Sequence, residues 1–266
     1  MNKKRKQETV VVGIIPARMA SSRFPGKPLK SILGLSMIEH VRRRALLCGI
    51  LDDVLVATCD REIAEEVTRF GGKVVMTSDQ HESCVDRVAE AAKGISAEVI
   101  INLQGDMPLL HPNILERLVA PFQQEKELKF TDMMGPIENA EEINNYNVVK
   151  VIVGLSGNSL YYSREPIPSL KKVSSALSVP RYKQLGINAF RRESLMIFSD
   201  LPRTPLEKIE SVDMLRLLEN GFVVRMVSSP YPVVGVDTLE DLKRAEERMR
   251  NDSIFYDYMK ENKQSN

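Results

Sequence analysis

Short apolar runs alternate with amphipathic segments along the first half of the chain. The apolar runs are rich in β-branched residues and do not alternate with polar positions, which is the pattern of strands buried on both faces of a parallel sheet. The predicted strands cover residues 10–15, 53–58, 73–77 and 98–103. The predicted helices cover residues 37–47, 63–70 and 86–93. This order predicts an α/β protein with a doubly wound, mostly parallel sheet and right-handed crossovers.

The second half of the chain has a different pattern, with paired short strands that indicate a smaller antiparallel lobe inserted into the first domain. The predicted elements are a hairpin of residues 147–153 and 159–163, a strand at 185–190, a helix at 205–220, a return strand at 223–227 and a helix at 239–250. The expected divisions are a disordered basic tail (1–8), an α/β part (9–130), the inserted lobe (131–222), a return strand and helix completing the first part (223–250) and a frayed polar tail (251–266).

Charge and composition exclude several classes of protein. Lysine and arginine number 37 against 36 aspartates and glutamates, so the net charge of +1 predicts neither a nucleic-acid partner nor a membrane-surface partner. No apolar run approaches the roughly 20 residues that cross a bilayer, and the segment behind the basic residues 3–6 is too short for a signal peptide. Three cysteines without a CxxC pair, Cys48, Cys59 and Cys84, are typical of a reduced, cytoplasmic protein.

The first predicted strand leads into a loop with the chemistry of a phosphate site. Pro16 cannot continue a hydrogen-bonded ladder, so the chain is expected to leave the sheet there. Arg18, Arg23 and Lys27 follow, together with Gly26, and supply the guanidinium forks, point charge and close backbone approach that a polyphosphate needs. A solvated basic loop is the alternative. Ligands of open α/β sheets bind beyond the carboxyl ends of strands, which favours the phosphate site, and the absence of GxGxxG argues against a dinucleotide enzyme.

Two aspartates are expected near this loop. Asp106 follows the strand at 98–103, although a turn-forming aspartate would look the same. Asp237 precedes the helix at 239–250, where Asp237 and Thr238 could be ordinary helix caps. Two carboxylates and three cations at strand ends are typical of a magnesium–nucleotide site.

Eight segments occur in the order found in the 3-deoxy-manno-octulosonate cytidylyltransferases, the CMP-Kdo synthetases, and the chain resembles that family from Val11 to about Arg248. The segments are IIPARMASSRFPGKPL, VVMTSDQHES, INLQGDMPLL, NVVKV, LYYSREPIP, LGINAFRR, PLEKIE and VDTLEDL. The resemblance implies a nucleotide-diphospho-sugar transferase type of fold. It also implies an Mg²⁺-dependent transferase that joins CTP to a 3-deoxy-2-ulosonic acid and releases pyrophosphate, for lipopolysaccharide or other surface-glycan synthesis. A homodimer formed through the second lobe is implied as well.

The resemblance also assigns roles to residues of this chain. The residues implied in catalysis are Arg18, Lys27, Asp106 and Asp237, of which the two aspartates would hold Mg²⁺. The residues implied in nucleotide binding are Pro16, Ala17, Arg18, Arg23, Lys27, Ser78, Ser83, Arg87 and Gln104. The residues implied in sugar-acid binding are Gln104, Lys150, Arg164, Gln184, Asn188 and Glu210.

Three segments depart from the family pattern. Where the family usually has His-x-Ser-Gly-Thr-(Asp/Glu)-Arg, this chain has Cys84 and Val85 in place of the glycine and the threonine. Gln184 and Asn188 stand where a histidine and a tyrosine are usual, and Met214 replaces a glutamine. Because several changes gather around the expected sugar pocket, we expect either Kdo or a related sugar acid as the substrate.

Two other functions stay open. A nucleotidyltransferase for sugar 1-phosphates would share the fold and the basic loop, and a diverged homologue could bind CTP without turnover. The combination of Lys150, Arg164 and Asp237 favours a sugar acid over a sugar phosphate. Of the remaining candidates, Cys84 is expected to be a small packing residue rather than a reactive thiol, and His81 a loop residue rather than a general base.

Overall fold

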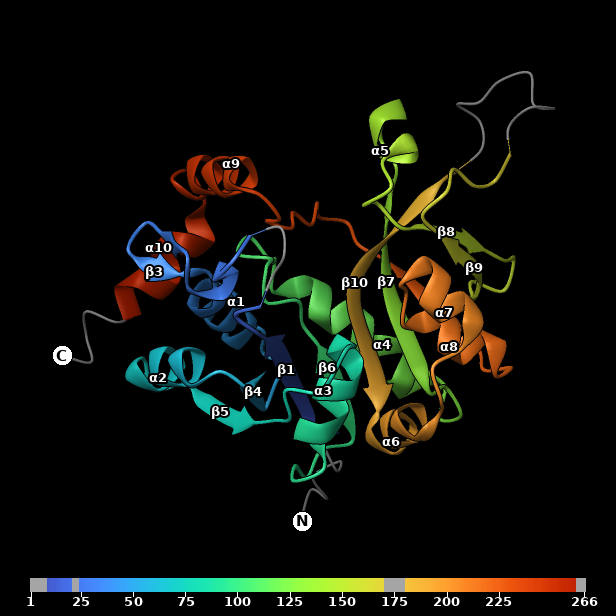
Figure 1. The fold of residues 1–266 in the computed structure, drawn as a ribbon, viewed down its shortest axis with the longest axis horizontal. Coiled ribbons are helices and arrows are strands. Elements are labelled where there is room, and N and C mark those ends of the chain that lie inside the picture. Colours follow the sequence, from blue (N-terminus) through green and yellow to red (C-terminus); the bar gives the residue numbers. More distant parts are fainter. Residues whose placement is uncertain (1–8, 21–23, 170–179, 262–266) are drawn as a thin grey trace, which may run out of the picture.

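The computed structural model describes residues 9–20, 24–169 and 180–261. Within them nine strands form one mixed sheet in the order β11-β7-β10-β6-β1-β4-β5, with β8 paired to β10 and β9 paired to β8 (Figure 1). The strands of this sheet are β1 Val11–Ala17, β4 Asp53–Thr58, β5 Lys73–Met76, β6 Val99–Asn102, β7 Phe130–Pro136, β8 Lys150–Val153, β9 Ser159–Ser163, β10 Tyr182–Arg191 and β11 Arg225–Ser228. A separate pair consists of β2 Ser31–Ile32 and β3 Leu35–Ser36.

The helices are α1 Met37–Leu46, α2 Arg61–Arg69, α3 Cys84–Ala92, α4 Asn113–Gln124, α5 Ala140–Asn144, α6 Arg192–Asp200, α7 Pro205–Glu210, α8 Met214–Glu219, α9 Leu239–Met249 and α10 Ser253–Glu261, with a short 3-10 helix at Lys27–Leu29. Apolar residues of α1, α2 and α4 cover one face of the sheet, and those of α3, α6 and α8 cover the other. The doubly wound fold expected from the sequence is thereby confirmed.

Strand direction divides the sheet into two parts. β6, β1, β4 and β5 are parallel, whereas β10 runs antiparallel to both β6 and β7. The inserted lobe therefore continues the main sheet, and the hairpin of β8 and β9 extends from it. The return strand differs from expectation, because β11 pairs with β7 at the far edge and not with a strand of the first part. The chain returns to the first part only beyond Ser228.

Three predicted boundaries were wrong for identifiable reasons. β1 continues through Pro16 to Ala17, because β6 is paired with β1 only as far as Ile14 and the missing N–H of Pro16 leaves no partner unsatisfied. The helix predicted at 205–220 is broken into α7 and α8 at Ser211, which has a left-handed φ of 54°. The tail predicted to be frayed from Asn251 contains α10.

α10 is ordered by contacts that lie far away in the sequence. Phe255 and Tyr258 are buried against the helix α9 and the β2–β3 pair. The Tyr258 hydroxyl lies 2.6 Å from His40 Nδ1, and burial lowers the pKa of His40 to about 4. Ile254, Phe255, Tyr258 and Met259 recur at helical spacing, which is the signal that the sequence prediction overlooked. In the part of the chain that the structure describes, no helix is long and apolar enough to cross a membrane.

Candidate active site

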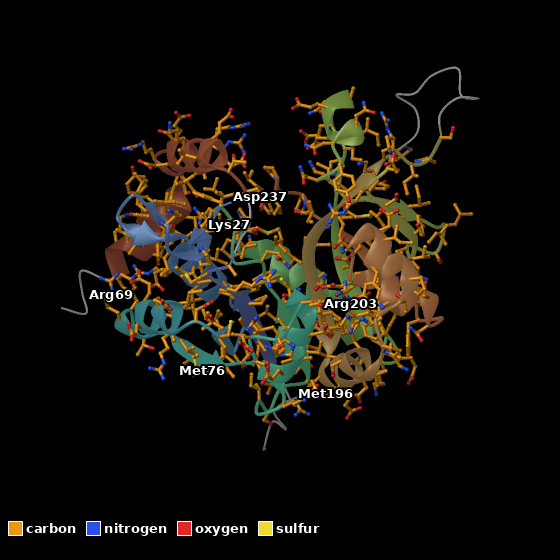
Figure 2. All side chains as sticks on the ribbon, viewed as in Figure 1. Lys27, Arg69, Met76, Met196, Arg203 and Asp237 are labelled. Carbon is orange, nitrogen blue, oxygen red and sulfur yellow. The ribbon has the colours of Figure 1, made fainter. Side chains whose placement is uncertain are left out.

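Lys27, Asp106 and Asp237 meet at the carboxyl ends of the central strands. Lys27 Nζ donates to Asp106 Oδ2 at 2.6 Å and to Asp237 Oδ1 at 3.1 Å. The three residues are separated by 79 and 210 positions, so only the folded sheet brings them together. Figure 2 shows Lys27 and Asp237 side by side above the end of β1. The structure thus brings both expected metal ligands, Asp106 and Asp237, into contact with one expected phosphate ligand, Lys27.

Local structure explains how each of the three is held. Gly26, with a φ of 69°, turns the chain into the short helix that starts at Lys27. The Val236 N–H donates to the Asp106 carbonyl at 2.9 Å, which joins the two acidic segments. Thr238 caps α9, with its hydroxyl accepting from the Asp241 N–H. Because Thr238 serves as the cap, the carboxylate of Asp237 is available to face Lys27.

The electrostatics of this cluster suit a cation. Burial would lower the pKa of Lys27, but the carboxylates of Asp106 and Asp237 outweigh it and raise the pKa, so the ammonium stays charged. No group of three or more histidine, cysteine or acidic side chains that could hold a metal occurs among the described residues. Mg²⁺ is commonly held by one or two protein carboxylates, with substrate phosphates and water completing its shell. A pair of converging aspartates fits that arrangement.

A cleft of about 950 Å³ opens beside this cluster, between the first part of the chain and the lobe. Its lining includes expected site residues from both sides, namely Ser83, Gln104, Asp106, Arg164, Gln184, Asn188 and Asp237. Gln104 Nε2 donates to the carbonyl of Gly186 at 2.8 Å, which links the two walls. Gly186 has a φ of 72°, a conformation that glycine adopts readily.

Two of the residues expected to bind the nucleotide, Arg87 and Ser78, form hydrogen bonds that hold the loop after β5. Arg87 is buried and donates to the Thr77 hydroxyl and the Ser78 carbonyl. The Ser78 N–H donates to Glu90. These bonds support the loop after β5, and the expected contacts of Arg87 and Ser78 with the nucleotide stay a prediction.

The other nucleotide residues lie at the end of β1. Pro16 and Ala17 are buried within the strand, and the Pro16 carbonyl lies 3.3 Å from the position that a Cβ would take on Gly105. Gly105 therefore lets the loop after β6 approach the end of β1. Arg18, directly after β1, is exposed. Arg23 lies outside the described residues, so its predicted role stays a prediction.

Lys150 does not reach the cleft, which corrects its expected role in binding the sugar acid. Its side chain is fully buried, and Nζ donates to the carbonyls of Asn145 (2.9 Å), Val148 (2.9 Å) and Arg164 (2.5 Å). An ammonium has three N–H donors, and all three are used. Lys150 consequently stabilises the base of the hairpin.

Glu210 is also turned away from the cleft. Its carboxylate accepts hydrogen bonds from the Ser163 hydroxyl at 2.8 Å and the Arg164 N–H at 2.8 Å, so it fixes the end of β9 rather than facing sugar hydroxyls. Arg164 does line the cleft, although three of its N–H groups donate to the carbonyls of Tyr146, Glu210 and Ser211. A guanidinium has more N–H groups than these three bonds use, whereas the three N–H groups of Lys150 are all used. Of these two cations, Arg164 is therefore the one with N–H groups left for a sugar carboxylate.

The segment that departs from the family pattern begins α3. The Ser83 hydroxyl accepts from the N–H groups of Val85 and Asp86 and donates to Asp213 Oδ2 at 2.8 Å, across the cleft. Cys84 is an exposed residue of the lining, so it is not the packing residue expected from the sequence. His81 lies in the preceding loop with Nε2 2.5 Å from Glu90.

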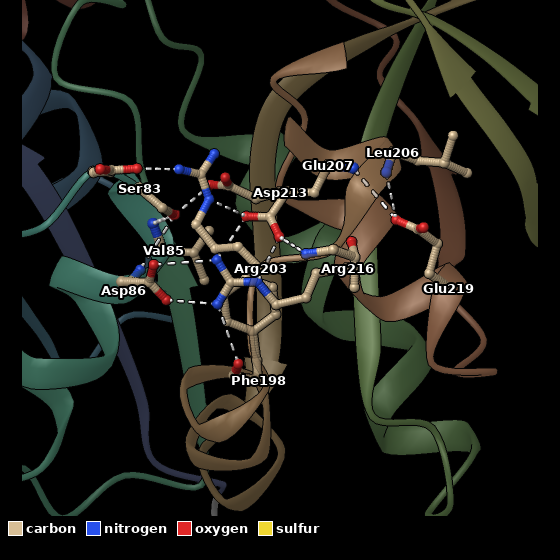
Figure 3. A network of polar contacts seen from close by, with 12 residues as sticks. Ser83, Val85, Asp86, Phe198, Arg203, Leu206, Glu207, Asp213, Arg216 and Glu219 are labelled. Carbon is tan, nitrogen blue, oxygen red and sulfur yellow. Dashed lines mark hydrogen bonds and ion pairs between the residues drawn. The ribbon is translucent and has the colours of Figure 1, made fainter. Parts of the chain in front are cut away.

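The two sides of the cleft are joined by an ion-pair network centred on Arg216 (Figure 3). Arg216 is 1% exposed, and its guanidinium contacts both oxygens of Glu207 on α7, at 2.9 and 2.7 Å, and both oxygens of Asp86 on α3, at 2.9 and 3.2 Å. The ring of Phe198 lies 4.1 Å from the guanidinium carbon. Burial opposes ionisation of Glu207, but the hydrogen bonds from Arg216 outweigh burial and lower the pKa of Glu207.

Two residues of the cleft region were missed from the sequence. Asp132 in β7 and Asn102 in β6 are buried polar residues inside otherwise apolar strands. A carboxylate or an amide within a run of apolar residues indicates a buried hydrogen-bond network, because a buried polar group needs partners. Asp132 lies behind Gln184 and Asn188, which both donate to it.

A mixed α/β sheet with converging aspartates, a lysine and a polar cleft at its strand ends defines a nucleotidyltransferase type of protein. The cytidylyltransferase family model matches residues 12–229, and this chain belongs to that family. It is similar to the 3-deoxy-manno-octulosonate cytidylyltransferases of Syntrophotalea carbinolica (41% identity, covering 90% of this chain and 98% of the relative) and Syntrophobacter fumaroxidans (42%, covering 92% and 98%). A solved CMP:2-keto-3-deoxy-manno-octonic acid synthetase complexed with CTP superposes with a TM-score of 0.85 at 37% identity, covering 91% of this chain and 99% of the other.

Proposed function

We propose that this protein joins CTP to a 3-deoxy-2-ulosonic acid, giving the CMP-sugar and pyrophosphate for surface-glycan synthesis in the cytoplasm. The observation that carries the proposal is the meeting of Lys27, Asp106 and Asp237 at one edge of a sugar-sized cleft. Relatives at about 40% identity bear the corresponding enzyme name, and the solved neighbour was determined with CTP.

The resemblance to the CMP-Kdo synthetases implies the reaction, and the charges of the site are compatible with it. The C2 hydroxyl oxygen of the sugar acid attacks the α-phosphorus of CTP, and the bond from that phosphorus to the bridging oxygen of the β-phosphate breaks. The hydroxyl proton passes to solvent, and pyrophosphate leaves with the bond's electron pair. Lys27 and Arg18 are the cations that we assign to neutralising the triphosphate. Positioning and charge stabilisation supply the catalysis, without a covalent enzyme intermediate.

Asp106 and Asp237 are the residues that would hold Mg²⁺. When bound, the metal would supply positive charge that stabilises the negative charge of the triphosphate during the transfer. Lys27, which neutralises both aspartates here, would then be free to bind a phosphate oxygen. On the lobe side, Arg164 is the cation that we assign to the sugar carboxylate, because Lys150 is fully engaged.

The identity of the sugar acid depends on the inner wall, where Gln184 and Asn188 stand in place of the usual histidine and tyrosine. We expect pyrophosphate release with CTP to be at least about tenfold faster than with ATP, GTP or UTP, and to differ strongly among 3-deoxy-2-ulosonic acids. The test measures pyrophosphate release for each nucleotide against Kdo and related acids. Turnover of a sugar 1-phosphate, or CTP binding without turnover of any acid, would contradict the proposal.

We further propose a homodimer in which a second copy covers the hairpin of β8 and β9. Two large apolar residues of this hairpin are exposed. Leu155 in the turn is fully exposed, and Leu160 in β9 is 63% exposed. Burying such side chains against a second copy of the chain would remove apolar surface from water. Sedimentation equilibrium is expected to give twice the mass of the chain, and Leu160→Lys to shift the protein towards the monomer. A native protein that sediments as a monomer would refute this assembly.

A further inference from the structure

A row of polar side chains crosses the sheet beneath the inner wall of the cleft. Asn102 on β6 is opposite Asn188 on β10, and Asn188 is opposite Asp132 on β7. All three residues are at most 4% exposed. Gln184 joins the row from β10, beyond the irregularity at Gly186. Asn102, Asn188 and Gln184 line the cleft, whereas Asp132 lies behind them.

The hydrogen bonds in this row all run towards Asp132. Asn102 Nδ2 donates to Asn188 Oδ1 at 2.8 Å, and Asn188 Nδ2 donates to Asp132 Oδ1 at 3.4 Å. Gln184 Nε2 donates to Asp132 Oδ2 at 2.8 Å. A carboxylate only accepts hydrogen bonds, so it fixes which end of each amide points inward.

At the end of the row away from Asp132, the side-chain oxygen of Asn102 has no hydrogen-bond donor among the described residues. This oxygen, Asn102 Oδ1, is buried, although Asn102 belongs to the cleft lining. A buried polar atom without a partner is costly, so a bound molecule that donates a hydrogen bond there would gain affinity. A carboxylate has no donor and would be repelled by an acceptor oxygen.

We propose that Asp132 is a positioning residue that sets the polarity of the amide row, so that the inner wall presents acceptor oxygens and binds hydroxyl groups of the sugar acid. The inference rests on the proposed function and adds the orientation of its substrate. The hydroxyl-bearing end of the sugar lies against Asn102, and the carboxylate lies on the opposite side, towards Arg164.

Protonation of Asp132 reverses this polarity. A carboxylic acid donates from one oxygen, and where Gln184 or Asn188 accepts that hydrogen bond, the amide turns its NH₂ group outward. The groups facing Asp132 are the amides of Gln184 and Asn188, the Tyr162 hydroxyl and the Met133 N–H, with no cation in ion-pair contact among the described residues. Burial raises the pKa of Asp132 to about 7, so the change falls near neutral pH.

The test compares native protein with Asp132→Asn, using the sugar acid that the native enzyme turns over fastest. Asparagine has the shape of the protonated acid and also donates. We expect the KM for the sugar acid to rise roughly tenfold in the variant, with the KM for CTP unchanged. Asp257→Asn, the same change at an exposed residue of α10, is the matched control and is expected to behave as native.

The native enzyme supplies an independent measurement, which holds even if Asp132→Asn fails to fold. Its KM for the sugar acid is expected to rise as pH falls through the Asp132 pKa, and this pH dependence is expected to be lost in the variant. An unchanged KM for the sugar acid, or equal changes in both KM values, would overturn the inference. Absence of turnover with every acid in the native enzyme would instead refute the proposed function.

Discussion

Replacing Asp106 by asparagine is expected to lower turnover by about 100-fold or more, because one of the two carboxylates that converge on the nucleotide site loses its charge. The amide keeps the size of the side chain and still has an oxygen to accept from Lys27, which also keeps its contact with Asp237. Pyrophosphate release at saturating CTP and sugar acid measures the effect.

Stability separates this loss from a loss of fold. The Lys27–Asp106 pair is partly exposed, with side chains at 15% and 27%, so its removal is expected to cost less than about 1 kcal/mol of the free energy of unfolding. The matched control is Asp257→Asn. Turnover within about threefold of the native rate would remove Asp106 from the metal and phosphate chemistry. A second readout is CTP binding, whose enhancement by Mg²⁺ is expected to disappear in the variant.

Replacing Arg216 by alanine is expected to produce the largest loss of stability, about 3 to 5 kcal/mol, because it leaves the buried carboxylate of Glu207 without its main partner. Arg216 also holds Asp86, so the variant loses the connection between α3 and the α7–α8 segment. Urea unfolding measures the change, and the melting temperature is expected to fall by roughly 10 °C.

Arg250→Ala is the matched control for this variant. Arg250 pairs with Glu246 on the surface and is 61% exposed, so its removal is expected to cost less than about 1 kcal/mol. Equal losses in Arg216→Ala and Arg250→Ala would show that the buried network does not stabilise the fold.

The pH dependence of the Arg216 variant follows from the pKa of Glu207. Because that pKa is lowered in the folded protein, the stabilisation is present above the ordinary value of 4.5 and is lost as pH falls through the folded-state pKa. The difference between native protein and Arg216→Ala is therefore expected to be full at neutral pH and to shrink below pH 4.5. A difference that grows on acidification would contradict this assignment.

The sequence was sufficient for the parts of the site that depend on strand ends. Lys27 lies in the loop after one predicted strand and Asp106 follows another, and parallel strands place their carboxyl ends at one edge of a sheet. The choice between a helix cap and a functional carboxylate at Asp237 could not be made from spacing, since Thr238 beside it can serve equally well as the cap. The capping bond between Thr238 and Asp241 shows that Thr238 is the cap, and the role of Asp237 in holding a metal stays a proposal.

The roles of charged residues on the lobe could not be predicted in the same way. Lys150 and Glu210 have the charge that a sugar acid or its hydroxyls require, yet both are occupied by partners fixed by the hairpin and α7. Whether a charged side chain faces a ligand or supports the main chain depends on long-range contacts. Asp132 shows the converse, since a carboxylate within an apolar strand marks a buried polar network.

The measurement that tests the central claim most directly is phosphorus NMR of the purified protein incubated with CTP, Mg²⁺ and Kdo or a related 3-deoxy-2-ulosonic acid. The account predicts that the CTP signals are replaced by those of pyrophosphate and a CMP-sugar phosphodiester in equal amounts, with no reaction when the acid is omitted. CTP that remains intact with every acid, or that is hydrolysed to CMP without a phosphodiester product, would contradict it.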